Sequence, residues 1–264
     1  MKRPLILGNQ KLFLNLSDAV DLANHLNRKI KLRPLACDLV LCPSFMNLGH
    51  VAAALSSSEI KVGAQNVHQV ETGPFTGQVS VRELVDLGVS HVILGHSEVR
   101  AQQGETNAQV RVKVEMCLQH GVVPVVCVGD TREEWEAGKS MDAVNRQLLE
   151  IFTPPLSVGL DAVVVAYEPL WAIKRGRDDK HTASASPEAA NRMHACIRSI
   201  LLRALGRSDI HILYGGSVNQ TNSSDLLTQD NIDGLLVGTA SVNADSFLAI
   251  LEGSEAPSTK LYVS

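Results

Sequence analysis

Eight short apolar segments recur along the chain, each built mainly of valine, isoleucine and leucine. They cover residues 5–8, 38–42, 60–64, 91–94, 122–128, 162–167, 210–213 and 234–237. Each is a nearly continuous apolar run without regular polar alternation, which is typical of parallel strands that are buried on both faces. The pattern therefore predicts eight strands of a parallel sheet.

Amphipathic segments lie between the predicted strands. In one of them, Val110, Val114 and Leu118 follow at intervals of four and form one apolar helical stripe. Another begins at Ser186, a hydroxyl cap that precedes proline at the first helical position. We expect Ser17 to cap the first helix. The predicted helices cover residues 17–26, 107–118, 141–151 and 187–205.

Eight alternations of strand and helix predict a closed α/β fold, a single (β/α)8 barrel. The length of 264 residues suits one such barrel, which we place at residues 1–252, and the polar stretch 253–264 is expected to be a tail. An open doubly wound sheet is the alternative. It is disfavoured because no Gly-x-Gly-x-x-Gly motif follows the first strand.

Charge and cysteine content narrow the possible partners. The chain has 24 Lys and Arg against 28 Asp and Glu, a net charge of −4, with no basic block. This argues against nucleic acid or an anionic membrane as a partner. No segment has the roughly 18 apolar residues of a membrane span, and no secretory leader is evident at the N-terminus. Five cysteines without a Cys-x-x-Cys pair predict a cytoplasmic protein with no metal site.

In a barrel of this kind, functional groups lie at the carboxyl ends of the strands. Asn9 and Lys11 follow the first strand on the same side, and an ammonium beside an amide can hold an anion. His96 follows the fourth strand where a helix can begin, so backbone N–H groups would keep its ring neutral. Taken alone, Asn9 and Lys11 are better explained as part of a solvated turn, and His96 could belong to a structural capping turn.

Glu168 directly follows a buried strand and precedes proline, which makes it a candidate general base. Its plainer interpretation is an acid in a surface ion pair. The turns after the last two strands contain glycine, at Gly216-Ser217 and Gly238-Thr239. Because glycine lacks a Cβ atom, backbone N–H groups in such turns can approach a phosphate closely.

Six segments together resemble the triosephosphate isomerase family, in the same order along the chain. They are Gly-Asn-Gln-Lys (8–11), Gly-Ala-Gln-Asn (63–66), Gly-His-Ser-Glu (95–98), Ala-Tyr-Glu-Pro-Leu-Trp-Ala-Ile (166–173), Tyr-Gly-Gly-Ser-Val (214–218) and Asp-Gly-Leu-Leu-Val-Gly (233–238). The likeness runs from Leu5 to about Leu251, and the segments around His96 and Glu168 are the most specific.

The resemblance implies a TIM barrel that interconverts dihydroxyacetone phosphate and D-glyceraldehyde 3-phosphate through an enediolate. It implies that Glu168 is the base, that neutral His96 polarises the carbonyl, that Lys11 stabilises the enediolate, and that Glu98 supports them. No cofactor is required, because the reaction only relocates protons. The residues implied for phosphate binding are Asn9, Lys11, Gly216, Ser217, Gly238 and Thr239.

The segment after Glu168 departs from the family pattern. Glu168 and Pro187 are 19 positions apart, about six more than the short family loop needs. Lys174 stands where the family has a glycine, and we expect its backbone N–H to bind the phosphate. Two alternatives therefore stay open. One is an isomerase of a longer sugar, such as a tetrulose phosphate, and the other is a non-catalytic barrel that binds phosphate.

The stretch 71–80 resembles the loop through which two subunits of the family interlock. The resemblance implies a homodimer in which Phe75 and Thr76 enter a partner pocket near Lys11 and Gln65. Val99 stands where the family usually has an arginine, which weakens one expected support of that contact. An ordinary surface loop is the alternative interpretation of this stretch.

Overall fold

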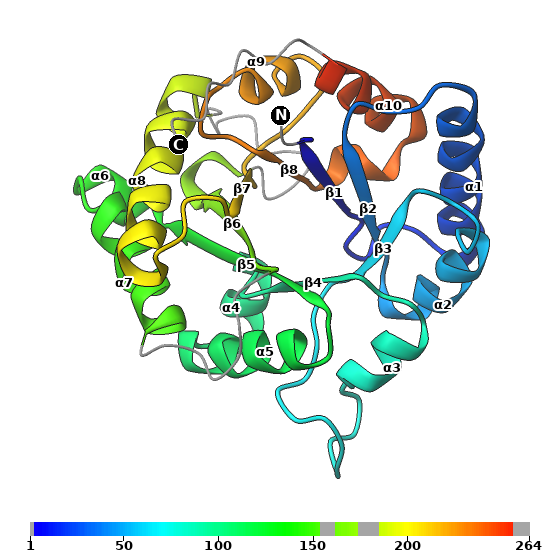
Figure 1. Cartoon of the computed structure of the whole chain (residues 1–264), viewed down its shortest axis with the longest axis horizontal. Coiled ribbons are helices and arrows are strands. Elements are labelled where there is room, and N and C mark those ends of the chain that lie inside the picture. The colour runs from blue at the N-terminus through cyan, green and yellow to red at the C-terminus, as the bar shows by residue number, and fades with distance from the viewer. Residues whose placement is uncertain (1–2, 154–161, 174–184, 256–264) are drawn as a thin grey trace.

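The computed structural model describes residues 3–153, 162–173 and 185–255. Eight strands form a closed barrel in which neighbouring strands are parallel and the first strand pairs with the last (Figure 1). The strands are β1 Leu5–Asn9, β2 Asp38–Cys42, β3 Lys61–Ala64, β4 His91–Leu94, β5 Val123–Asp130, β6 Val164–Pro169, β7 His211–Tyr214 and β8 Gly234–Val237. The predicted (β/α)8 barrel is confirmed, and the open sheet is excluded.

Helices surround the barrel on its outer side (Figure 1). They are α1 Leu16–Leu32, α2 Phe45–Ala54, α3 Val81–Asp86, α4 Ser97–Gln103, α5 Asn107–Gln119, α6 Arg132–Glu136, α7 Ser140–Phe152, α8 Pro187–Leu205, α9 Ser223–Leu227 and α10 Ala244–Glu252. The described residues also form three short 3-10 helices, η1 Leu170–Ala172, η2 Thr239–Val242 and η3 Gly253–Glu255.

Of the two predicted helix caps, one is confirmed and one is wrong. The hydroxyl of Ser186 accepts the backbone N–H of Ala189 at 3.2 Å, as predicted for the start of α8. Ser17 as the cap of α1 is wrong. The cap lies two residues earlier, at Asn15, whose Oδ1 accepts the N–H of Asp18 at 2.9 Å. Asparagine and serine cap equally well, so the residue that completes an extra half turn takes the position.

Two apolar clusters alternate along the strands. Leu5 and Leu7 belong to a small cluster inside the barrel, whereas Ile6 belongs to the larger cluster between strands and helices. This follows because successive side chains of a strand point to opposite faces. The interior is therefore packed with side chains and leaves the strand ends as the place for a site.

The same alternation positions two of the candidate site residues. Asn9 continues the inward row of Leu5 and Leu7 along β1, and Glu168 continues that of Val164 and Ala166 along β6. Both side chains are consequently delivered to the C-terminal end of the barrel. They are 5% and 3% exposed, respectively.

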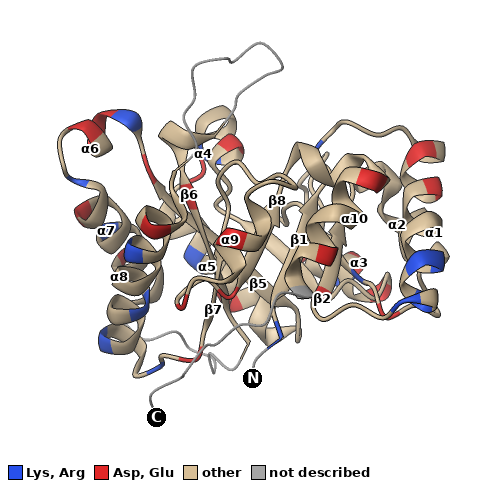
Figure 2. Ribbon diagram, turned by 90° about the horizontal axis from the view of Figure 1, so that it is seen from above, with Lys and Arg blue, Asp and Glu red and all other residues tan. Residues whose placement is uncertain are grey.

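In the ribbon of Figure 2, acidic and basic residues are interspersed along the described helices. None of the helices that the structure describes combines the length and apolarity needed to cross a bilayer. Of the tail expected from residue 253, the first three residues form η3, and Ser254 is buried. Residues 256–264 lie outside the described residues.

Candidate active site

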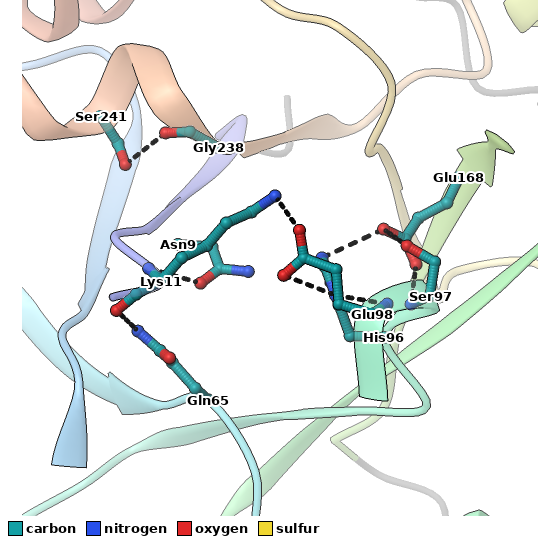
Figure 3. Close-up of polar contacts among 9 residues, drawn as sticks. All are labelled: Asn9, Lys11, Gln65, His96, Ser97, Glu98, Glu168, Gly238 and Ser241. Atoms are coloured by element: carbon teal, nitrogen blue, oxygen red, sulfur yellow. Dashed lines mark hydrogen bonds and ion pairs between the residues drawn. The ribbon is translucent and has the colours of Figure 1, made fainter. Parts of the chain in front are cut away.

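The side chains of Glu168 and His96 contact each other at the C-terminal end of the barrel (Figure 3). Oε1 of Glu168 lies 3.2 Å from Nε2 of His96. Ser97 adds two donors, since its backbone N–H donates to Oε2 at 2.9 Å and its hydroxyl donates to Oε1 at 3.1 Å. The first turn of α4 therefore holds the carboxylate of β6 against the imidazole ring.

The hydrogen bonds of His96 determine where its ring carries a proton. His96 caps α4, and its Nδ1 accepts the backbone N–H of Glu98 at 3.2 Å. A ring nitrogen that accepts from an N–H group has a free lone pair, so this geometry assigns the proton to Nε2 of a neutral ring. Nε2–H is the group that faces Glu168, and it can donate a hydrogen bond to a substrate oxygen placed beside the carboxylate.

Lys11 has a left-handed backbone with φ of 49°, which costs a non-glycine residue about 1–3 kcal/mol. Two hydrogen bonds hold this conformation. Its N–H donates to Oδ1 of Asn9 at 3.2 Å, and its carbonyl accepts from Nε2 of Gln65 at 3.0 Å. The ammonium lies 2.6 Å from Oε1 of Glu98 (Figure 3). The strained turn thus directs the ammonium of Lys11 toward Glu98, two positions after His96.

Gln65 was identified from the sequence only as a neighbour of a partner loop. Its side-chain amide also donates to the carbonyl of Cys42 at 3.0 Å, so it joins the ends of β1 and β2 to the turn after β3. The structure therefore gives Gln65 a role within its own subunit, which is to fix the backbone of Lys11.

The peptide groups that precede His96 are held from two sides. The N–H of Gly95 donates to Oε2 of Glu105 at 2.8 Å, and the carbonyl of Gly95 accepts from Nε of Arg100 at 2.6 Å. Gly95 has a φ of 68°, which glycine adopts without strain. Its backbone therefore presents His96 to the barrel mouth in one orientation.

A buried polar network joins this support to the turn that carries Lys11. The carboxylate of Glu105 is paired with the ammonium of Lys113, and both residues are buried. Lys113 also donates to Oδ1 of Asn66 at 3.0 Å. Because Asn66 directly follows Gln65, one chain of contacts underlies both the ammonium and the imidazole.

The glycine turns after β7 and β8 lie beside the two charged side chains. A Cβ atom built on Gly215 would lie 3.1 Å from Cγ of Glu168, and one built on Gly238 would lie 3.9 Å from Nζ of Lys11. At Gly216 a Cβ atom would collide with the hydroxyl of Tyr214, so only glycine fits there. Both turns are thus close to the reactive groups, as the order of motifs predicts.

The two polar residues expected in these turns, Ser217 and Thr239, lie in different local structures. The hydroxyl of Ser217 donates to the carbonyl of Ala172 at 2.8 Å, which ties the β7 turn to the segment after Glu168. Thr239 is the first residue of η2, directly after Gly238. Lys174 lies outside the described residues.

A cavity of about 330 Å³ opens between the turns after β1, β3 and β4. Asn9, Lys11, Gln65, His96 and Glu98 are among the residues that line it. Glu168 does not line this cavity, but it contacts His96, which does. Among the described residues, no three His, Cys, Asp or Glu side chains gather closely enough to hold a metal ion.

Comparison with known proteins agrees with this geometry. The chain matches the family model described as Triosephosphate isomerase over residues 4–254, which is nearly its whole length. The chain belongs to the triosephosphate isomerase family. It is 39% identical over 254 residues to the triosephosphate isomerase of Alkaliphilus oremlandii, with 95% of this chain and 99% of the relative covered.

Other triosephosphate isomerases are equally similar across their full length. That of Magnetococcus marinus is 40% identical over 258 residues, covering 96% of this chain and 99% of the relative. That of Thermus thermophilus is 41% identical over 257 residues, covering 95% and 98%. The family resemblance stated from six short motifs is therefore confirmed for the chain as a whole.

Within this triosephosphate isomerase family site, sequence reasoning missed three supporting side chains. Ser97 was quoted only as part of a motif, although it supplies two donors to the base. Glu105 and Lys113 were not singled out. The signal that could have found this pair is a charge on the inner face of a predicted helix, since Lys113 lies three positions after Val110 and four before Cys117, both of which are buried.

Proposed function

We propose that the chain interconverts dihydroxyacetone phosphate and D-glyceraldehyde 3-phosphate by proton transfer through an enediolate. The observation that carries this proposal is the arrangement of three groups at one barrel end. The carboxylate of Glu168 contacts the neutral imidazole of His96 at 3.2 Å, and the ammonium of Lys11, from the turn after β1, lies 2.6 Å from Glu98. Family membership supports the same reaction.

The proton transfers follow from the roles that these groups can perform. Glu168 removes a proton from the carbon next to the carbonyl, and the electron pair of that C–H bond forms the double bond of the enediolate. The proton then returns from Glu168 to the adjacent carbon. His96 gives the proton of Nε2 to the oxygen of the original carbonyl and takes up the proton of the neighbouring hydroxyl, whose oxygen becomes the new carbonyl. Lys11 stabilises the negative charge that develops on these oxygens.

Phosphate binding rests on backbone donors near Lys11. Gly216 and Ser217 would donate from the β7 turn, Gly238 and Thr239 from the β8 turn, and Lys174 from its backbone N–H. Asn9 and the ammonium of Lys11 complete the pocket. Because the net charge of the chain is −4, attraction of a phosphate dianion depends on these local donors.

A coupled assay of the purified chain tests the proposal. We expect rapid turnover of both triose phosphates and little or none of a tetrulose phosphate. Turnover of the tetrulose phosphate alone would favour a longer-sugar isomerase. Binding of inorganic phosphate without any turnover would favour a non-catalytic barrel. In a cell the proposed reaction would serve glycolysis and gluconeogenesis in the cytoplasm, where the five free cysteines would stay reduced.

We also propose that two copies of the chain form a homodimer through the surface around the loop 71–80. Large apolar side chains are exposed at cavity-lining positions or next to them in sequence, among them Leu12 at 89%, Phe13 at 56% and Met46 at 86%. Phe75 is 40% exposed, and Phe45 and Leu12 line the cavity of Lys11. Large apolar side chains exposed in one region favour a protein interface there. Phe75 and Thr76 of one copy would cover that surface on the other.

Sedimentation of the purified chain at micromolar concentration is expected to give a dimer. Phe75→Asp should shift the equilibrium toward monomer, because it places a charge in a desolvated contact. Leu202→Asp is the matched control, since Leu202 is 51% exposed on α8, outside the proposed surface. A purely monomeric wild type, or equal dissociation of both variants, contradicts the proposed interface.

A further inference from the structure

The two tryptophans of the chain stack on each other beside the candidate base. The indole rings of Trp135 and Trp171 have centroids 4.4 Å apart and planes inclined by 17°. Trp171 lies in η1, three positions after Glu168, whereas Trp135 lies in α6 after the neighbouring strand β5. Trp135 is 45% exposed, an unusual position for so large an apolar ring on a five-residue helix.

Trp171 is also held by two hydrogen bonds from the same segment that carries Trp135. Its indole Nε1–H donates to Oδ2 of Asp130 at 3.0 Å, and its carbonyl accepts from the guanidinium of Arg132 at 3.2 Å. The segment 130–135 therefore contacts Trp171 in three places. Trp135 covers a face of the indole ring, Asp130 accepts from its N–H, and Arg132 binds its backbone carbonyl.

Asp130 also binds Tyr167, the residue that precedes Glu168. The hydroxyl of Tyr167 donates to Oδ1 of Asp130 at 2.7 Å, and Asp130 is fully buried. Burial, with Asp130 as a lesser cause, raises the pKa of the Tyr167 phenol, so the hydroxyl remains a donor at neutral pH. Tyr167 and Trp171 stand on either side of Glu168, and both are fixed to one carboxylate.

The support that carries Trp135 is itself well anchored. Thr131 and Glu134 form a capping box, in which the N–H of Glu134 donates to the Thr131 hydroxyl at 3.2 Å and the N–H of Thr131 donates to Oε2 of Glu134 at 3.0 Å. Such reciprocal bonds fix the first turn of a short helix. The capping box therefore fixes the helix from which the ring of Trp135 stacks on Trp171.

We propose that Trp135 is a positioning residue, whose indole stacks on Trp171 and thereby holds the segment Glu168–Trp171 in the geometry for proton transfer. This inference rests on the proposed isomerase function. Trp135 touches no reacting group itself and acts only through Trp171. Its contribution is expected in the chemical step, because a small displacement of the base lowers the rate of proton transfer more than it weakens substrate binding.

Two variants and a control test this inference. Trp135→Leu removes the ring while keeping an apolar side chain, and Trp135→Phe keeps an aromatic face. Leu202→Ala is the control, since Leu202 is similarly exposed, at 51%, but lies in the last turn of α8. We expect Trp135→Leu to lower kcat about 3- to 10-fold, the range that one aromatic stack supports. KM should change less than about twofold, and Trp135→Phe should regain most of kcat.

Circular dichroism provides a readout that does not depend on activity. Because the chain has only two tryptophans, an exciton couplet between indoles can arise only from this pair. We expect the couplet in the wild type and in Leu202→Ala, and its loss in both Trp135 variants. An active wild type without the couplet, or an unchanged kcat in folded Trp135→Leu, or no recovery in Trp135→Phe, overturns the inference. A wild type that shows the couplet but no triose phosphate turnover instead refutes the proposed function.

Discussion

Glu168→Asp is expected to lower kcat by a factor of about 10² or more, because shortening the side chain withdraws the base by about 1 Å from the carbon that it must deprotonate. The carboxylate of Glu168 is 3% exposed and is held by His96 and by both donors of Ser97. A shorter side chain cannot keep these contacts and reach the substrate equally well. Steady-state kinetics of the purified variant, with both triose phosphates, measure the effect.

The control for this variant is the same change at an exposed glutamate. Glu136→Asp, at the end of α6, shortens a side chain by the same methylene group on the surface. It should leave kcat within about twofold of the wild type, as surface substitutions away from a site usually do. Both variants should retain the wild-type circular dichroism in the far ultraviolet. If Glu168→Asp is as fast as Glu136→Asp, Glu168 has no part in the mechanism.

The strands could be predicted from the sequence because burial on both faces leaves a direct trace. The runs at 38–42, 91–94 and 234–237 agree with β2, β4 and β8 residue for residue. The two-residue alternation placed Asn9 on the side of β1 opposite Gln10, and the place of Glu168 directly after a buried run put it at a strand end. These positions depend only on local periodicity, so a single sequence suffices to find them.

The support of the site could not be predicted in the same way. The strained turn of Lys11 depends on Gln65, which lies 54 positions along the chain. The orientation of Gly95 depends on Glu105, and the ends of the segment 167–171 depend on Asp130. Such bonds between a side chain and a distant backbone group follow no period, and they become visible only when the barrel brings the turns together.

Gln10 shows that the alternation of side chains along a strand does not predict their hydrogen bonds. It lies between Asn9 and Lys11 in the sequence, so the alternation of β1 directs its side chain away from the site. The structure buries it to 1% exposure, and among the described residues neither polar atom of its amide has a hydrogen-bond partner. A buried amide without partners costs about 1–3 kcal/mol. Alternation predicts which face a side chain occupies but not whether its polar atoms find partners there.

Lys11→Met is expected to lower kcat/KM by about 10² to 10³, the effect of removing one charged or hydrogen-bonding group that stabilises a developing oxyanion. The ammonium of Lys11 lies 2.6 Å from Glu98 and beside the β8 turn at Gly238. Methionine has a similar length and keeps the apolar part of the side chain, so the loss can be assigned to the charge. Kinetics at several salt concentrations measure both the rate and the attraction of the phosphate.

Removal of the ammonium also takes the lysine partner from Glu98, whose negative charge then repels a phosphate dianion. The double variant Lys11→Met with Glu98→Gln separates the two effects. If Lys11 acts on the transition state, the double variant should regain part of the lost affinity, seen as a lower KM, while kcat stays low. A full recovery of kcat in the double variant would instead mean that Lys11 only neutralises Glu98. The backbone hydrogen bonds to Asn9 and Gln65 do not involve the side chain of Lys11, so both variants should retain the strained turn and differ from the wild type in charge alone.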